Sequence, residues 1–164
     1  MISKDELLAA MMRECDICIH LHGKIPDGGL EYRPTEGQRS TIELLRYLSF
    51  VGIGMGRALA EGDWTPYTEM AEAAEALSAE EFPEAMERQK RALGDFLAGL
   101  TEDDLRDRRA SLPWGEEYPL GRALLEMPYA CLVAYRMQLF LYAKAAGNHA
   151  IQTPNCWAGV DMEA

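Results

Sequence analysis

The fold is decided by residues 124–147, which read LLEMPYACLVAYRMQLFLYAKAAG. Apolar side chains recur in this stretch at spacings of three and four, which is typical of an amphipathic helix. We expect the helix to extend from Leu120 to about Ala146 and to end at Gly147. Pro128 predicts a kink, because a proline inside a helix removes one backbone hydrogen bond and displaces the carbonyl four residues earlier. The stripe expected on one side comprises Leu124, Met127, Cys131, Tyr135, Gln138 and Tyr142.

Three earlier segments show the same helical period. We expect helices at residues 4–22, 41–61 and 79–100. Start signals of one kind, a hydroxyl residue followed three positions later by an acid, form capping boxes that satisfy free backbone N–H groups. They occur at Ser3 with Glu6, Ser40 with Glu43, Ser78 with Glu81 and Thr101 with Asp104. Four long amphipathic segments without a convincing strand predict an all-α four-helix bundle that forms one domain over residues 1–164.

The connections between these helices are less regular. Residues 64–77 fit either a helix or a mobile connection, and residues 112–118 fit a short non-helical loop or extended pair before the last helix. Residues 149–164 show no helical period. We expect them to form an irregular C-terminal tail that packs on the bundle through Trp157.

The composition excludes some classes of function. The 164 residues include 16 Lys and Arg against 27 Asp and Glu, which gives a formal net charge of −11. This excess of acid opposes contact with phosphate backbones, so we expect no nucleic-acid partner. No apolar window of about 20 residues exists and the N-terminus lacks a signal-peptide pattern, which predicts no membrane partner and a cytoplasmic location. The four cysteines fit free thiols in a reducing compartment.

One segment of the first helix has metal-ligand residue types. Cys15, Cys18 and His22 lie at positions i, i+3 and i+7, so they can share one face of the helix. Zinc is bound by such thiolates and imidazoles, but one helix supplies no fourth ligand unless Cys131 completes the set across the bundle. Buried cysteines also behave as small apolar residues, so core packing is the competing interpretation.

Two stretches together carry a family resemblance. Residues 32–45, from Tyr-Arg-Pro to Ile-Glu-Leu-Leu, and residues 124–147 resemble in order and spacing the DinB-like (YfiT-like) superfamily of metalloenzymes. The resemblance implies a four-helix bundle in which three histidines from two helices hold a divalent metal with an open coordination position. It also implies a homodimer and, in some relatives, transferase activity with low-molecular-weight thiols.

The residues at the implied metal position are not histidines. The resemblance places Tyr47, Cys131 and Tyr135 there, and phenols with a pKa near 10 are poor metal ligands at neutral pH. We therefore expect a metal-free protein whose remnant pocket either is filled by these side chains or binds a small molecule. The alternative is a thiol-dependent transferase or hydrolase in which Cys131 is the catalytic residue, with or without Zn or Ni.

Overall fold

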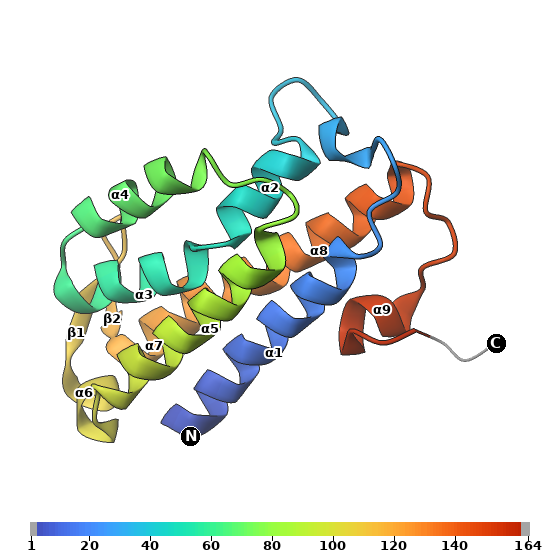
Figure 1. Cartoon of the computed structure of the whole chain (residues 1–164). Coiled ribbons are helices and arrows are strands. Elements are labelled where there is room, and N and C mark those ends of the chain that lie inside the picture. Colours follow the sequence, from blue (N-terminus) through green and yellow to red (C-terminus); the bar gives the residue numbers. More distant parts are fainter. Residues whose placement is uncertain (1–2, 162–164) are drawn as a thin grey trace.

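Four long helical segments form the body of the molecule, as the sequence predicts (Figure 1). The computed structural model describes residues 3–161. The first segment is α1 (Lys4–His22), and the third is α5 (Phe82–Ala98). The second consists of α2 (Thr41–Leu48) and α3 (Val51–Glu61), and the fourth of α7 (Leu120–Leu124), a π-helical turn η2 (Leu125–Tyr129) and α8 (Ala130–Ala145). α1 packs against both α5 and α8, and its inner side contributes Leu7, Met11, Cys15 and Cys18 to the apolar core.

Shorter elements connect and cover these segments. The 3-10 turn η1 (Gly29–Glu31) precedes α2, and α4 (Thr65–Ala74) packs on α3 and α2. α6 (Glu102–Asp107) leads into an antiparallel pair, β1 (Arg109–Ser111) and β2 (Glu117–Pro119), in which Ala110 lies opposite Tyr118. Within residues 3–161, no helix is both long and apolar enough to cross a membrane.

Three of the four capping boxes form as predicted. Ser3, Ser40 and Thr101 each accept the backbone N–H of the acid three positions later, and that acid accepts the N–H of the cap residue. Ser78 keeps only the second of these bonds, and α5 begins at Phe82 rather than near residue 79. The capping signal at Ser40 therefore fixes the start of α2, the helix that carries Tyr47.

The prediction of one continuous helix over residues 41–61 is wrong. The chain breaks at Ser49 and Phe50, and the buried side chain of Gln89 bonds the backbone groups freed there. Its amide nitrogen donates to the carbonyl of Leu48 at 2.9 Å, and its oxygen accepts the N–H of Gly52 at 2.8 Å. A Cβ at Gly52 would lie 3.1 Å from that oxygen, so any larger residue here would crowd the Gln89 side chain.

The last long segment is interrupted at Pro128, where a kink is predicted. Because proline has no N–H, the carbonyl of Leu124 lacks its usual α-helical donor, and the chain makes one π-helical turn at this point. The N–H of Ala130 then bonds the carbonyl of Leu125, five residues earlier.

The C-terminal tail differs from its prediction. Instead of remaining irregular, Thr153–Ala158 form a short helix, α9, which packs on α1 and α8. Asn155 and Cys156 of α9 are buried, whereas Trp157, expected to pack on the bundle, is 58% exposed. The residues that dock the tail are therefore Asn155 and Cys156. Of the expected tail, residues 162–164 lie outside the described part of the chain.

Candidate functional site

Tyr47, Cys131 and Tyr135 come together from two helices. The Tyr47 hydroxyl of α2 lies 3.5 Å from the Cys131 sulfur of α8, a distance at which either group can donate a hydrogen bond. The rings of Tyr47 and Tyr135 meet edge to face, with their centroids 4.8 Å apart. All three residues are half-buried. The side chains at the implied metal position thus pack on one another.

The protonation of these groups follows from their burial. Burial raises the pKa of the Tyr47 hydroxyl, and the hydrogen bond with Cys131 raises it further. Burial also raises the pKa of the Cys131 thiol, against smaller lowering effects of the Tyr47 hydrogen bond and the Arg39 charge. Both groups are therefore neutral at pH 7. Zn²⁺ and Ni²⁺ sites are built from thiolates, imidazoles and carboxylates, so two phenols and a single thiol are a poor donor set for a divalent metal.

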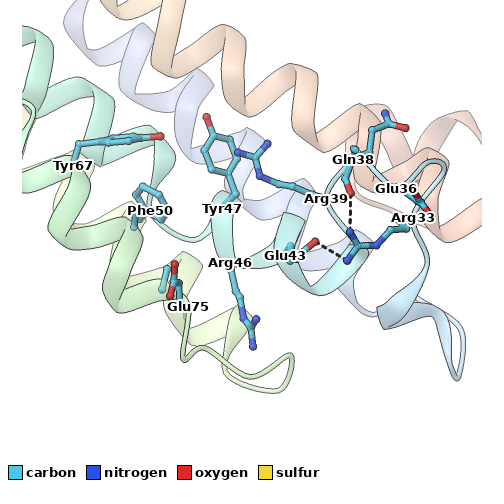
Figure 2. Close-up of a pocket in the computed structure, with 13 residues that line it drawn as sticks. Arg33, Glu36, Gln38, Arg39, Glu43, Arg46, Tyr47, Phe50, Tyr67 and Glu75 are labelled. Atoms are coloured by element: carbon cyan, nitrogen blue, oxygen red, sulfur yellow. Dashed lines mark hydrogen bonds and ion pairs between the residues drawn. The ribbon is translucent and has the colours of Figure 1, made fainter.

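A pocket of about 670 Å³ lies beside these three residues, between α2, α4 and the loop that precedes α2 (Figure 2). Tyr47 forms part of its wall, whereas Cys131 and Tyr135 do not line it. Such a volume is in the range of small-molecule sites. The pocket is lined by Arg33, Glu36, Gly37, Gln38, Arg39, Glu43, Arg46, Tyr47, Phe50, Tyr67, Ala71, Ala74 and Glu75.

Aromatic rings make up the inner wall of the pocket. Phe50 packs edge to face on Tyr47, with 5.8 Å between ring centroids, and on Tyr67 at 5.3 Å. Tyr67 comes from α4, and the break between α2 and α3 places Phe50 between the two tyrosines. The helix break that Gln89 stabilises therefore also shapes this wall.

Three arginines surround the mouth of the pocket and differ in their partners. Arg33 donates to Glu43 at 3.2 Å and to the Gln38 carbonyl at 3.2 Å. Arg46 donates from Nε to the carbonyl of Leu77 at 3.0 Å. The guanidinium of Arg39 instead lies over the ring of Tyr47, 4.1 Å from its centroid. Within residues 3–161 the side chain of Arg39 forms no ion pair and no hydrogen bond.

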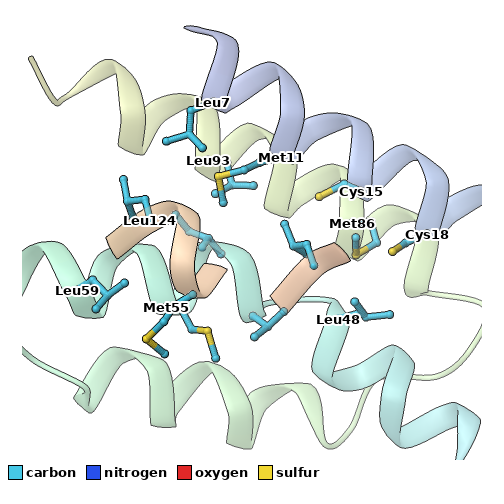
Figure 3. Packing of buried hydrophobic residues seen from close by; sticks show 14 of the residues in the cluster. Leu7, Met11, Cys15, Cys18, Leu48, Met55, Leu59, Met86, Leu93 and Leu124 are labelled. Carbon is cyan, nitrogen blue, oxygen red and sulfur yellow. The ribbon is translucent and has the colours of Figure 1, made fainter. Parts of the chain in front are cut away.

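Cys15, Cys18 and His22 do not form a site in this structure. Both cysteines are fully buried and point into the apolar cluster (Figure 3). Burial raises the pKa of Cys15 to about 12 and that of Cys18 well above its ordinary value. His22 lies against the ring of Phe82, with 5.5 Å between centroids. Among residues 3–161, no three His, Cys, Asp or Glu side chains are arranged to hold a metal ion.

A buried ion pair lies on the other side of α8. Arg136, 2% exposed, donates from Nε to Glu14 of α1 at 2.6 Å. Its Nη1 donates to the carbonyl of Cys156 and lies 3.2 Å from the sulfur of that residue. Arg136 thus joins α1, α8 and α9.

Sequence reasoning missed two functional features. Nothing in the helical period of α1 marks Glu14 as the buried partner of Arg136. Arg39 precedes a helix cap and has no motif of its own, and only the folded chain places it over Tyr47. A basic residue one position before the Ser40 cap is the single local signal that points to it.

Comparison with known proteins identifies the architecture. No family model and no curated protein matches the sequence. A crystal structure of a DinB-like protein, YjoA from Bacillus subtilis, matches the fold with a TM-score of 0.67. The two chains are 21% identical, and the match covers 87% of this chain and 92% of the other. The order and packing of the helices described above are therefore those of a DinB-like fold.

Proposed function

We propose that this protein is a metal-free small-molecule-binding protein with a DinB-like fold, and that its ligand occupies the pocket between α2 and α4. The observation that carries the proposal is the pocket of about 670 Å³, where aromatic rings and guanidinium groups converge. The rings offer a ligand an apolar surface, and the charged side chains around them offer polar contacts that would orient it. Tyr47, Cys131 and Tyr135 support the metal-free state, since two phenols beside a single thiol are a poor ligand set for a divalent metal.

The competing transferase or hydrolase would use Cys131 as its nucleophile. A nucleophilic cysteine is activated by a lowered pKa, whereas burial raises the pKa of this thiol. Cys131 also does not line the pocket, whereas its hydrogen-bond partner Tyr47 does. These two observations favour the binding function.

Two measurements test the proposal. Elemental analysis of tag-free protein, purified without added metal and again after incubation with Zn²⁺ and Ni²⁺, should give far less than one atom per chain. A small-molecule library screened by thermal shift should contain compounds that raise the melting temperature, and their effect should disappear when the pocket is filled. One metal atom per chain would contradict the metal-free state.

Ala71→Phe fills the pocket from α4, where Ala71 is part of the lining. Ala76→Phe is its matched control, because Ala76 is exposed, lies just beyond α4 and lines none of the pockets described. Stabilising compounds should lose their effect on Ala71→Phe and keep it on Ala76→Phe. Equal effects on both variants would place the ligand elsewhere.

We also propose that the protein forms a homodimer through the outward side of η2 and α8. Apart from Glu126 this side is apolar, although the bundle covers it only in part. Leu125, Tyr129 and Val133 line a shallow surface hollow there, and Leu141 is 53% exposed further along the helix. Exposed apolar side chains gathered on one side of a helix are typical of an interface, and a second copy of the chain would cover them.

A further inference from the structure

The guanidinium of Arg39 has N–H groups at the mouth of the pocket that are available to a ligand. The Tyr47 ring covers one face of its guanidinium, 4.1 Å from the ring centroid, and the ring of Tyr135 lies 5.7 Å away. Figure 2 shows the Arg39 side chain extended along the pocket wall toward Tyr47. The N–H groups at the edge of the guanidinium meet no acceptor in the part of the chain that the structure describes. A stacked guanidinium with a free edge is held in place to receive a planar oxyanion through two parallel hydrogen bonds.

A second arginine makes a useful comparison. Arg122 is also exposed and also lies over a tyrosine, 3.7 Å from the ring centroid of Tyr118, but its Nε donates to Glu126 at 3.2 Å. An arginine of this protein can therefore lie over a tyrosine ring and bind a carboxylate at the same time. The absence of a described carboxylate beside Arg39 distinguishes the pocket arginine from Arg122.

The wall next to Arg39 indicates the body of the ligand. Tyr47, Phe50 and Tyr67 form a row of rings in successive edge-to-face contacts of 5.8 and 5.3 Å. A flat unsaturated group packs favourably on such rings, and a carboxylate attached to it can reach the guanidinium that already lies over Tyr47. The ring wall thus suits the flat body of a ligand, and the Arg39 guanidinium suits its carboxylate.

The remaining charges favour an anion with a single negative charge over a dianion. Glu36, Glu43 and Glu75 line the same pocket, and the whole chain carries a net charge of −11. Arg33 already neutralises Glu43, and Arg46 adds positive charge but is held by the carbonyl of Leu77. A dianion such as a phosphate monoester would meet stronger repulsion from these carboxylates than a monocarboxylate meets.

We propose that the pocket binds an aromatic or conjugated monocarboxylate, with its carboxylate on Arg39 and its flat body on the wall formed by Tyr47, Phe50 and Tyr67. This inference rests on the proposed binding function and adds the chemical class of the ligand.

The test uses three probes on the full-length protein. trans-Cinnamate supplies the flat body and the single charge, cinnamamide keeps the shape without the charge, and phenyl phosphate supplies a dianion. Each is titrated by NMR and by calorimetry into the wild-type chain and into Arg39→Gln. Arg122→Gln is the matched control, because it removes the same charge and the same kind of stacking away from the pocket.

We expect cinnamate to bind the wild-type chain and to shift the signals of Tyr47 and Tyr67. It should bind at least about tenfold more weakly to Arg39→Gln, as expected for the loss of a charge-assisted hydrogen-bonded pair, and with unchanged affinity to Arg122→Gln. Cinnamamide and phenyl phosphate should both bind the wild-type chain more weakly than cinnamate does.

Two results would overturn the inference and would have different meanings for the proposed function. If cinnamamide binds in the pocket as tightly as cinnamate and Arg39→Gln has no effect, the ligand class is wrong and the binding function stands. If none of the three probes binds, the ligand class is again wrong. A library screen that then yields no compound sensitive to Ala71→Phe would remove the binding function as well.

Discussion

Cys131 is the residue on which a catalytic interpretation depends, and its reactivity can be predicted. Because burial raises the pKa of the thiol above its ordinary value of 9.0, the thiol is protonated at neutral pH, and its reactivity grows with the thiolate fraction as the pH rises toward the pKa. Alkylation by iodoacetamide, followed by mass spectrometry of the peptide that contains Cys131, should therefore be slow at pH 7.5. Its rate should still be rising at pH 9.

Arg39→Gln provides the control for this profile. The Arg39 charge lowers the pKa of Cys131, so its removal should move the alkylation profile to higher pH. A rate that reaches its plateau below pH 8 in the wild-type chain would show a thiolate at neutral pH. That result would restore the transferase interpretation.

The ion pair of Arg136 and Glu14 predicts a large loss of stability when one partner is replaced, and a partial recovery when both are replaced. Arg136→Met leaves the carboxylate of Glu14 buried without a partner, which typically costs about 3–5 kcal/mol of unfolding free energy. Replacing both residues, as Glu14→Gln with Arg136→Met, removes the unpaired charge and should recover a substantial part of that loss. Urea denaturation of the single and double variants measures both values, and additive losses would contradict the predicted coupling.

At the scale of the helix, local sequence signals account for much of the fold. α1 has the predicted bounds, and the hydroxyl caps at Ser3, Ser40 and Thr101 form as expected, because capping depends only on residues three positions apart. The break at Ser49 is stabilised by Gln89, about 40 residues further along the chain. The helical period of residues 41–61 gives no information about this long-range hydrogen bond. α9 has only six residues, too few to show a period.

The candidate site could be predicted only in part for the same reason. The meeting of Tyr47 with Cys131 follows from the resemblance, which places both at one position between two helices. The pocket beside them depends on where α4 lies. The sequence of residues 64–77 fits a helix and a mobile connection equally well, so it does not predict that position. Arg39 is part of the site only because α4 and the loop before α2 enclose a space next to it.

The break between α2 and α3 should be among the most sensitive positions of the bundle. Gln89→Leu leaves the Leu48 carbonyl and the Gly52 N–H buried without partners, and each unsatisfied group costs about 1–3 kcal/mol. We expect the free energy of unfolding to fall by about 2–4 kcal/mol in urea denaturation. Gln138→Leu is the control, because the half-buried Gln138 bonds the hydroxyl of Tyr142 and no backbone group. Equal losses in the two variants would contradict the role of Gln89.

At the scale of the whole molecule, the proposed dimer can be tested by light scattering during gel filtration. Val133→Glu places a charge on the outward side of α8, where Val133 lines the surface hollow, and should shift the mass from dimer to monomer. Trp114→Glu introduces the same charge at another exposed apolar residue, at the turn between β1 and β2, and should leave the mass unchanged. A monomeric wild-type chain would refute the dimer.

The same distribution of charge affects how fast a ligand arrives. A carboxylate that diffuses toward this protein first meets the repulsive field of a molecule with net charge −11, and feels the attraction of Arg39 only at close range. Added salt screens the distant repulsion more than a contact of a few ångströms, because the screening length is about 8 Å at physiological ionic strength. Association of the ligand should therefore become faster as moderate salt is added, the reverse of the slowing seen when opposite net charges attract.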